Sequence, residues 1–139
     1  MTANSVTITV NMPCEHIFPV VSNISNWSNW VPVLISAPVH LNNATGTGAR
    51  YSFPSRSRGQ QPESQLEITD IIPDRKLKWR YSGGMDGWGS MSLTPESDGT
   101  RIVLEEEVAL PGLPAQLLQE LLEKGASNMK RYLENLSES

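Results

Sequence analysis

The sequence predicts an α+β protein in which one curved antiparallel sheet is covered by a long C-terminal helix. Three observations predict this class. A β-type alternation opens the chain, a series of short alternating segments fills the middle, and a helical apolar period closes it. We therefore expect seven strands, two short N-terminal helices and one long helix, folded as a single domain over residues 1–139.

The first element is a strand over residues 5–10, SVTITV, in which Val6, Ile8 and Val10 share one face. Pro13 then suits the first position of a helix. The apolar spacing that follows is typical of one helix face and consists of Cys14, Ile17, Phe18 and Val21. Pro19 should kink or shorten this helix, because proline removes a backbone hydrogen bond.

Two tryptophans stand in a polar segment, NISNWSNW, directly after this helix. The capping residues of the segment predict a second short helix, on which Trp27 and Trp30 share a face. Three interpretations of the pair are open: a plug of the core, a wall of a ligand pocket, or a platform for stacking nucleic-acid bases. A net charge of −4 speaks against the last, because such platforms need a basic groove.

From Val33 onward the apolar period becomes two. Turn-like sequences such as NNATGTG, IPDRK and SGGMDG separate the alternating segments. The predicted strands are 33–41, 48–54, 63–72, 76–82, 88–95 and 100–109. Short strands with short connections form an antiparallel meander.

The last predicted element is a helix over residues 113–137, about 37 Å long at 1.5 Å per residue. Its predicted apolar stripe consists of Leu117, Leu118, Leu121, Leu122, Gly125, Met129, Tyr132, Leu133 and Leu136. The only large surface that can cover this stripe is the apolar face of the sheet. Because a curved sheet lifts away from a straight helix, we expect a cavity between them.

Composition narrows the classes of function. Cys14 is the only cysteine, so neither an internal disulfide nor a thiolate metal cluster is expected. The N-terminal residues lack the pattern of a signal peptide, and no apolar run approaches the length of a membrane span. We expect a cytoplasmic protein without stable membrane insertion, without a nucleic-acid partner, and existing as a monomer or homodimer.

The ordered set of segments resembles the START-like, helix-grip superfamily, which includes polyketide cyclases and dehydratases, birch-allergen-like proteins and lipid-transfer domains. The resemblance covers nearly the whole chain and lies in VTITVNMPCEHIFPVVSNISNWSNWVP, LEITDIIPDRKLKWRY, LTPESDGTRIVLEEEV and ASNMKRYLENL. It implies a helix-grip fold around a cavity and, if the protein is an enzyme, cyclisation or dehydration of the bound molecule. It also implies an aromatic lining residue at Trp27.

Standard catalytic motifs are absent: there is no P-loop, no G-x-S-x-G and no H-E-x-x-H. His16 does not lie on the apolar face of its predicted helix, and His40 lies near the end of a predicted strand. We therefore predict no metal site and no cofactor.

The position of Glu106 needs an explanation, because this acidic residue shares a strand face with the apolar residues Ile102, Leu104 and Val108. A buried carboxylate is costly unless it is paired. Glu106 could lie at a bulge or strand end in solvent, pair structurally with Arg50 or another base, or act on a ligand in a pocket. If it acts, we expect Glu106 as acid and base, Tyr81 as donor to a carbonyl or enolate, and Arg50 as charge stabiliser.

The predicted ligand-binding residues are mostly apolar and lie on inward strand faces, the short helix and the long helix. They are Trp27, Tyr51, Phe53, Leu66, Ile68, Trp79, Met85, Trp88, Met91, Leu104, Leu118 and Leu122. In a meander the exit loops 55–62, 83–87 and 110–113 gather at one end, beside the start of the long helix, and we expect the pocket to open there.

Three functions remain open from the sequence. The leading one is binding, and possible cyclisation or dehydration, of a small hydrophobic, aromatic or polyketide-like molecule. The second is a carrier or sensor of a lipid, isoprenoid or quinone. The third is a protein-binding module that presents Trp27, Trp30 and Trp88 on its surface.

Overall fold

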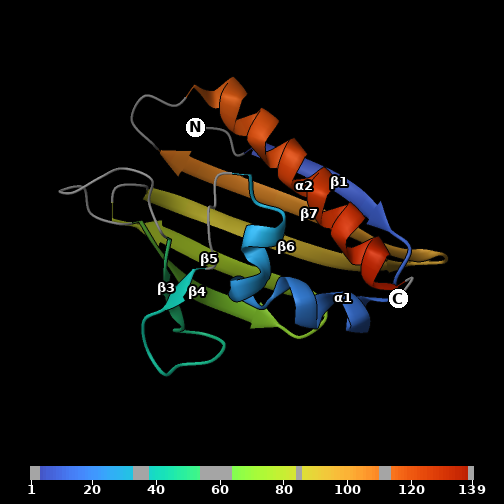
Figure 1. Cartoon of the computed structure of the whole chain (residues 1–139), viewed down its shortest axis with the longest axis horizontal. Helices are drawn as coiled ribbons and strands as arrows, with labels where there is room; N and C mark the ends of the chain where they lie inside the picture. The colour runs from blue at the N-terminus through green and yellow to red at the C-terminus, as the bar shows by residue number, and fades with distance from the viewer. Residues whose placement is uncertain (1–3, 33–37, 54–63, 84–85, 110–113, 138–139) are drawn as a thin grey trace.

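The computed structural model of the protein describes residues 4–32, 38–53, 64–83, 86–109 and 114–137. Seven strands and one long helix appear in the predicted order, with two short helical elements after the first strand (Figure 1). In chain order these are β1 (Asn4–Val10), α1 (Cys14–Val21), the 3-10 helix η1 (Ile24–Asn29), β2 (Val39–His40), β3 (Arg50–Ser52), β4 (Gln65–Ile72), β5 (Lys76–Ser82), β6 (Asp86–Glu96), β7 (Gly99–Ala109) and α2 (Ala115–Ser137). The predicted fold class is confirmed.

The strands form a single antiparallel sheet in the order β1-β7-β6-β5-β4-β3-β2. The first strand therefore pairs with the last, from Asn4 opposite Glu106 to Val10 opposite Thr100. Helix α2 crosses one face of this curved sheet beside β1 and β7, and α1 and η1 lie on the same side of the sheet further along it (Figure 1). This arrangement gives the molecule two layers with the core between them.

Strand boundaries differ from the prediction where the backbone takes special conformations. Strand β3 begins at Arg50 and not at residue 48, because Gly46 and Gly48 adopt positive φ angles of 78° and 91°. Of the predicted strand 33–41, Val39–His40 is a strand, and residues 33–37 lie outside the described residues. Strand β6 runs longer than predicted, from Asp86 to Glu96, because it pairs along β7 as far as the turn.

Both tryptophans of the opening segment are buried, Trp27 at 4% and Trp30 at 5% exposure. Trp27 contacts Trp79 edge to face, with ring centroids 4.8 Å apart, and its Nε1 donates to the Val21 carbonyl at 2.9 Å. Trp30 packs against Tyr132 of α2 at a centroid distance of 5.5 Å. Burial explains why indole rings stand in a polar segment: η1 turns them into the space between α2 and the sheet.

The buried part of the apolar stripe of α2 is shorter than predicted. Leu117 and Leu136, at its two ends, are each 41% exposed. Met129 and Leu133 are fully buried, as is Ala126, which the predicted stripe omits.

Helix α2 also protects the free edge of β1. Its Gln119 Nε2 donates to the Ser5 carbonyl at 3.0 Å, and its Lys130 Nζ donates to the Thr9 carbonyl at 2.6 Å. Unpaired edge carbonyls invite pairing with another chain, and these side chains occupy two of them. Across the described ranges, no helix is long and apolar enough to cross a membrane.

Candidate ligand cavity

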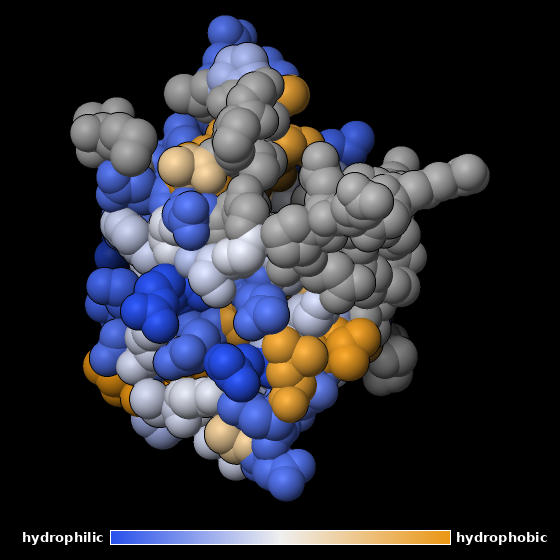
Figure 2. Space-filling view, turned by 90° about the vertical axis from the view of Figure 1, so that its left-hand side faces the viewer, coloured by the Kyte–Doolittle hydropathy of each residue, from blue (hydrophilic) through white to orange (hydrophobic). Residues whose placement is uncertain are grey.

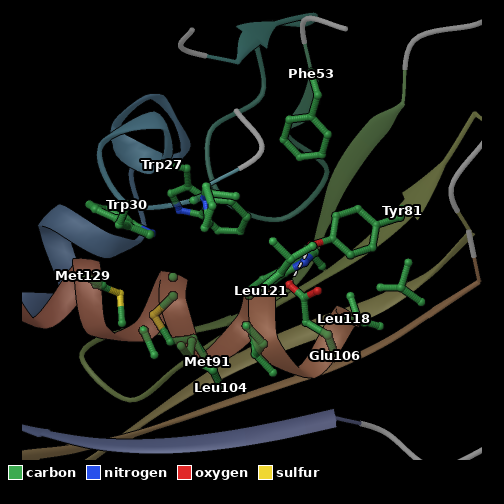
Figure 3. Close-up of a pocket in the computed structure, with 17 residues that line it drawn as sticks. Trp27, Trp30, Phe53, Tyr81, Met91, Leu104, Glu106, Leu118, Leu121 and Met129 are labelled. Atoms are coloured by element: carbon green, nitrogen blue, oxygen red, sulfur yellow. Dashed lines mark hydrogen bonds between the residues drawn. The ribbon is translucent and has the colours of Figure 1, made fainter. Parts of the chain in front are cut away.

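A cavity of about 230 Å³ lies between the sheet, α2 and η1 (Figure 3). For scale, a dry engineered cavity of about 150 Å³ suffices to bind benzene. Among its described lining residues, only Tyr81 and Glu106 carry a side-chain oxygen. The lining consists of Trp27, Trp30, Val31, Pro32, Phe53, Trp79, Tyr81, Met91, Leu104, Glu106, Val108, Leu118, Leu121, Leu122, Gly125, Ala126 and Met129.

The sheet register places the strand residues of this cavity. Trp79 on β5 is opposite Gly89 on β6, which is opposite Glu106 on β7. Residues opposite one another point to the same face of an antiparallel sheet, so Trp79 and Glu106 both face the cavity. Gly89 between them has no side chain, and that space is filled by the Trp79 ring.

Tyr81 and Glu106 form a hydrogen-bonded pair. The Tyr81 hydroxyl donates to Glu106 Oε1 at 2.9 Å. Figure 3 shows this pair near Leu118 in the cavity, whereas Trp30 and Met129 lie toward its other end. The cavity therefore has a carbon-lined body and one polar end.

Burial changes the acid–base properties of this pair. Desolvation raises the pKa of Glu106 from 4.5 to about 7, although the hydrogen bond from Tyr81 acts in the opposite direction. Burial, followed by the charge of Glu106, raises the pKa of Tyr81 well above its ordinary value. With its pKa raised in this way, Glu106 has both protonation states within reach near neutral pH and can give or accept a proton.

The structure brings nine of the predicted site residues to this cavity. They are Trp27, Phe53, Trp79, Tyr81, Met91, Leu104, Glu106, Leu118 and Leu122. Their roles in binding or catalysis remain predictions, since the cavity shows where they lie and not what they bind.

Arg50 does not join the Tyr81–Glu106 pair. It lies exposed on β3, where its neighbour across the strands is Glu67, and its backbone N–H donates to Asn42 Oδ1 at 3.2 Å. The expected role of Arg50 as charge stabiliser, and the alternative of a structural Arg50–Glu106 pair, both lack the proximity they require.

Four other predicted ligand-binding residues lie elsewhere in the fold. Leu66 and Ile68 are buried in the core beside the cavity. Tyr51 stacks on His40 with ring centroids 4.6 Å apart. Trp88 lies on the other face of the sheet, where its Nε1 donates to Glu107 Oε2 at 3.0 Å. Met85 lies outside the described residues.

The site prediction also missed residues that line the cavity. Leu121, Gly125 and Met129 belong to the predicted helix stripe, and Val108 shares the strand face of Glu106, so these four had a signal in the sequence. Trp30 had one in its spacing from Trp27. Ala126 had one as well, because it lies four residues after Leu122 and three before Met129, on the same helix face. Val31 and Pro32 had none, because nothing in their local pattern indicates an inward direction.

The expected mouth of the cavity is at the end where β3, β5 and β7 terminate and α2 begins (Figure 1). Figure 2 views the molecule from this end, where apolar side chains stand among polar ones and the grey segments. Residues 54–63, 84–85 and 110–113 lie outside the described residues, so the predicted exit loops stay a prediction.

Two sequence hypotheses can be compared directly with the side chains. The protein-binding module would present Trp27 and Trp30 on the surface, and both are buried.

The two histidines are both exposed. His40 Nε2 lies 2.9 Å from the Ala44 carbonyl oxygen. Among the described residues, no cluster of three metal-binding side chains occurs.

A curved antiparallel sheet gripping one long helix around an internal cavity defines the helix-grip class of proteins. The family described as "Polyketide cyclase / dehydrase and lipid transport" matches residues 1–137. The chain belongs to this family. A comparison with curated protein sequences finds no match.

Solved structures with the same fold differ widely in sequence. A protein from Chromobacterium violaceum has a TM-score of 0.76 at 14% identity, over 96% of this chain and 99% of that one. The Aha1 dimer from Colwellia psychrerythraea has a TM-score of 0.73 at 14% identity, over 96% and 97%. A protein of the dynemicin biosynthetic locus has a TM-score of 0.66 at 20% identity, over 95% of this chain and 47% of its own. At these identities the likeness shows the fold alone.

Proposed function

We propose that this protein binds one compact, mostly apolar molecule, aromatic or polyketide-like, and promotes its cyclisation or dehydration. The observation that carries the proposal is the hydrogen-bonded pair of Tyr81 and Glu106 at one end of a cavity whose other described lining residues are apolar. A volume of about 230 Å³ is below the range of about 300–1,000 Å³ typical of drug-sized ligands, which favours a small ring system. Membership in the cyclase, dehydrase and lipid-transport family supports the same class of ligand.

The chemistry follows from two groups. Ionised Glu106 takes a proton from the carbon beside a ligand carbonyl, and the resulting enolate attacks a second carbonyl of the same molecule to form a carbon–carbon bond. After Glu106 has taken the proton, the Tyr81 hydroxyl is released from the carboxylate. It then donates its hydrogen bond to the ligand oxygen on which negative charge develops. Protonated Glu106 then returns its proton to the new alkoxide. In a following dehydration, ionised Glu106 removes a neighbouring C–H proton and then gives this proton to the hydroxyl, which leaves as water as the carbon–carbon double bond forms.

The first step can be tested alone with an aryl β-diketone deuterated between its carbonyls. We expect the protein to accelerate exchange of deuterium for solvent hydrogen, followed by NMR. Glu106→Gln should lower the rate by about 10²–10⁴, the usual contribution of a general base. Glu107→Gln is the matched control, because Glu107 is adjacent on β7 but bonds Trp88 on the opposite face. Equal exchange by the wild-type protein and Glu106→Gln would refute a catalytic Glu106.

The rival function is a carrier or sensor of a lipid, isoprenoid or quinone. Its support is that the described lining residues other than Tyr81 and Glu106 carry no side-chain oxygen. A carrier would bind the β-diketone or a quinone saturably and release it unchanged. Its Glu106→Gln variant would bind the same molecule equally well. That result would move the function to transport while leaving the cavity as the binding site.

A further inference from the structure

The indole nitrogen of Trp79 is buried, and it has no hydrogen-bond partner among the described residues. Buried N–H groups are almost always paired, so an exception requires an explanation. Trp27 provides the contrast, because its equally buried Nε1 donates to a backbone carbonyl. The unpaired donor is therefore specific to the position of Trp79.

Gly89 fixes the direction in which this N–H edge lies. A Cβ built on Gly89 would come within 2.5 Å of Nε1, Cε2 and Cζ2 of Trp79. These atoms form the nitrogen-bearing edge of the indole, which consequently lies over Gly89. Because Gly89 stands between Trp79 and Glu106 in the register, this edge reaches from β5 toward β7.

Tyr81 is the next inward residue on β5, and its hydroxyl crosses the same space to reach Glu106. Burial and the charge of Glu106 raise the pKa of Tyr81, whereas the Trp79 side chain, acting as a hydrogen-bond donor, lowers it. The Trp79 N–H therefore faces the Tyr81 oxygen. Among the described residues, the Tyr81 oxygen is thus the nearest candidate acceptor for this buried nitrogen.

We propose that Trp79 is a positioning residue whose N–H donates to the Tyr81 oxygen when the Tyr81–Glu106 pair carries negative charge. Ionised Glu106 draws the Tyr81 proton toward itself, which makes the Tyr81 oxygen a better acceptor. Hydrogen bonds in such a chain strengthen one another. The proposal rests on the proposed function, because the relay from Trp79 through Tyr81 to Glu106 tunes the pair that acts on the ligand.

Among the described residues, Tyr81 is the one side chain that hydrogen-bonds Glu106. From β1, Asn4 is the register neighbour of Glu106, and α2 contributes Leu118, Leu121 and Leu122 to the cavity. On the η1 side, the Trp27 N–H is already bonded to Val21. Tyr81 is the one titratable group shown to act on Glu106, and Trp79 is the one free donor beside Tyr81 among the described residues.

The test follows the four indole N–H resonances of the ligand-free protein by NMR while the pH is raised through 7. We expect the Trp79 resonance to move downfield, with the same pH midpoint as the titration of Glu106. That titration is measured separately on the labelled carboxyl carbon of Glu106. The Trp27 resonance should not move, since its acceptor is a backbone carbonyl. Glu106→Gln should abolish the movement, and so should Tyr81→Phe, because the relay passes through the tyrosine oxygen.

A second readout is the titration of Glu106 in the variant Trp79→Phe, which keeps an aromatic ring and removes the N–H. The titration midpoint of Glu106 should rise by less than about one pH unit, because the N–H acts on the carboxylate only through Tyr81. Trp30→Phe, the matched control, should leave the midpoint unchanged, because Trp30 lines the same cavity but packs against Tyr132.

The outcomes separate the two proposals. A Trp79 resonance that ignores pH while Glu106 titrates near 7 would overturn the relay and leave the proposed function standing. A Glu106 that titrates near its ordinary value in the wild-type protein would contradict both. The first arm compares the wild-type protein with Glu106→Gln, so it stands even if Trp79→Phe fails to fold.

Discussion

A single carboxyl group accounts for much of what is unusual at the residue scale. Glu106 lies on the apolar side of β7 because strand alternation gives it the direction of Leu104 and Val108. Its location costs free energy whenever it is charged, since burial disfavours the ionised form. Such a cost is typical of a group kept for chemistry or recognition and not for stability.

The cost of this carboxyl group can be measured as pH-dependent stability. With the pKa of Glu106 raised from 4.5 in the unfolded chain to about 7, the folded state binds more protons between these values. The free energy of unfolding therefore falls as the pH rises through that window, by about 3 kcal/mol from this group. Glu106→Gln should lack this fall and be more stable than the wild-type protein above pH 7.

Urea unfolding of both proteins at acid and at alkaline pH measures this difference directly. Glu107→Gln controls for the loss of one negative charge on β7. Parallel stability–pH curves for the wild-type protein and Glu106→Gln would show that Glu106 is not desolvated in the folded protein.

Gly89 makes the second prediction at this scale. An alanine Cβ there would overlap the Trp79 indole at 2.5 Å, so the ring would have to shift. Overpacking of this kind costs about 1–3 kcal/mol. We expect Gly89→Ala to lose that much stability in urea unfolding and to alter tryptophan fluorescence, whereas Ser92→Ala, on the other face of β6, should do neither. Unchanged stability would mean that Trp79 does not lie over Gly89.

At the scale of elements, alternation and helical period predicted most of the fold, and strand register explains the remainder. The direction of Trp79, Met91, Leu104 and Glu106 follows from period-two patterns within single strands. The Tyr81–Glu106 contact depends on the pairing of three strands, which no local pattern contains. Arg50 could not be oriented from the sequence because the positive φ of Gly48 interrupts the strand before it.

Helix α2 supplies a prediction that separates stability from cavity volume. A Cβ on Gly125 would meet Pro32 Cδ at 3.5 Å and the Trp30 carbonyl oxygen at 3.7 Å, which are ordinary contacts. Glycine inside a helix is less stable than alanine by about 0.5–1 kcal/mol. Gly125→Ala should therefore raise the free energy of unfolding by about that amount while shrinking the cavity it lines.

The matched variant is Ser127→Ala, at an exposed position of the same helix. It should give a smaller gain in stability and leave ligand affinity unchanged, whereas Gly125→Ala should weaken binding. If Gly125→Ala were less stable than the wild-type protein, the space between α2 and the segment that follows η1 would be too small for the added methyl group, against the prediction.

At the scale of the whole molecule, the sheet and α2 enclose a cavity because a curved surface and a straight helix cannot touch everywhere. The topology predicted from the sequence implied such a space, and the structure contains a cavity of about 230 Å³ there. Which molecule fills the space was beyond prediction, since an apolar lining defines size and polarity and no chemical identity.

The measurement that tests the central claim most directly is native mass spectrometry of the whole chain with a panel of aromatic polyketides, quinones and fatty acids. We expect one molecule of a compact aromatic compound to bind saturably. Leu121→Phe, which fills the cavity, should lose this binding, and Leu117→Phe, at an exposed position one turn earlier, should retain it. Binding that persists equally in Leu121→Phe, or no binding across the panel, would contradict a ligand cavity between α2 and the sheet.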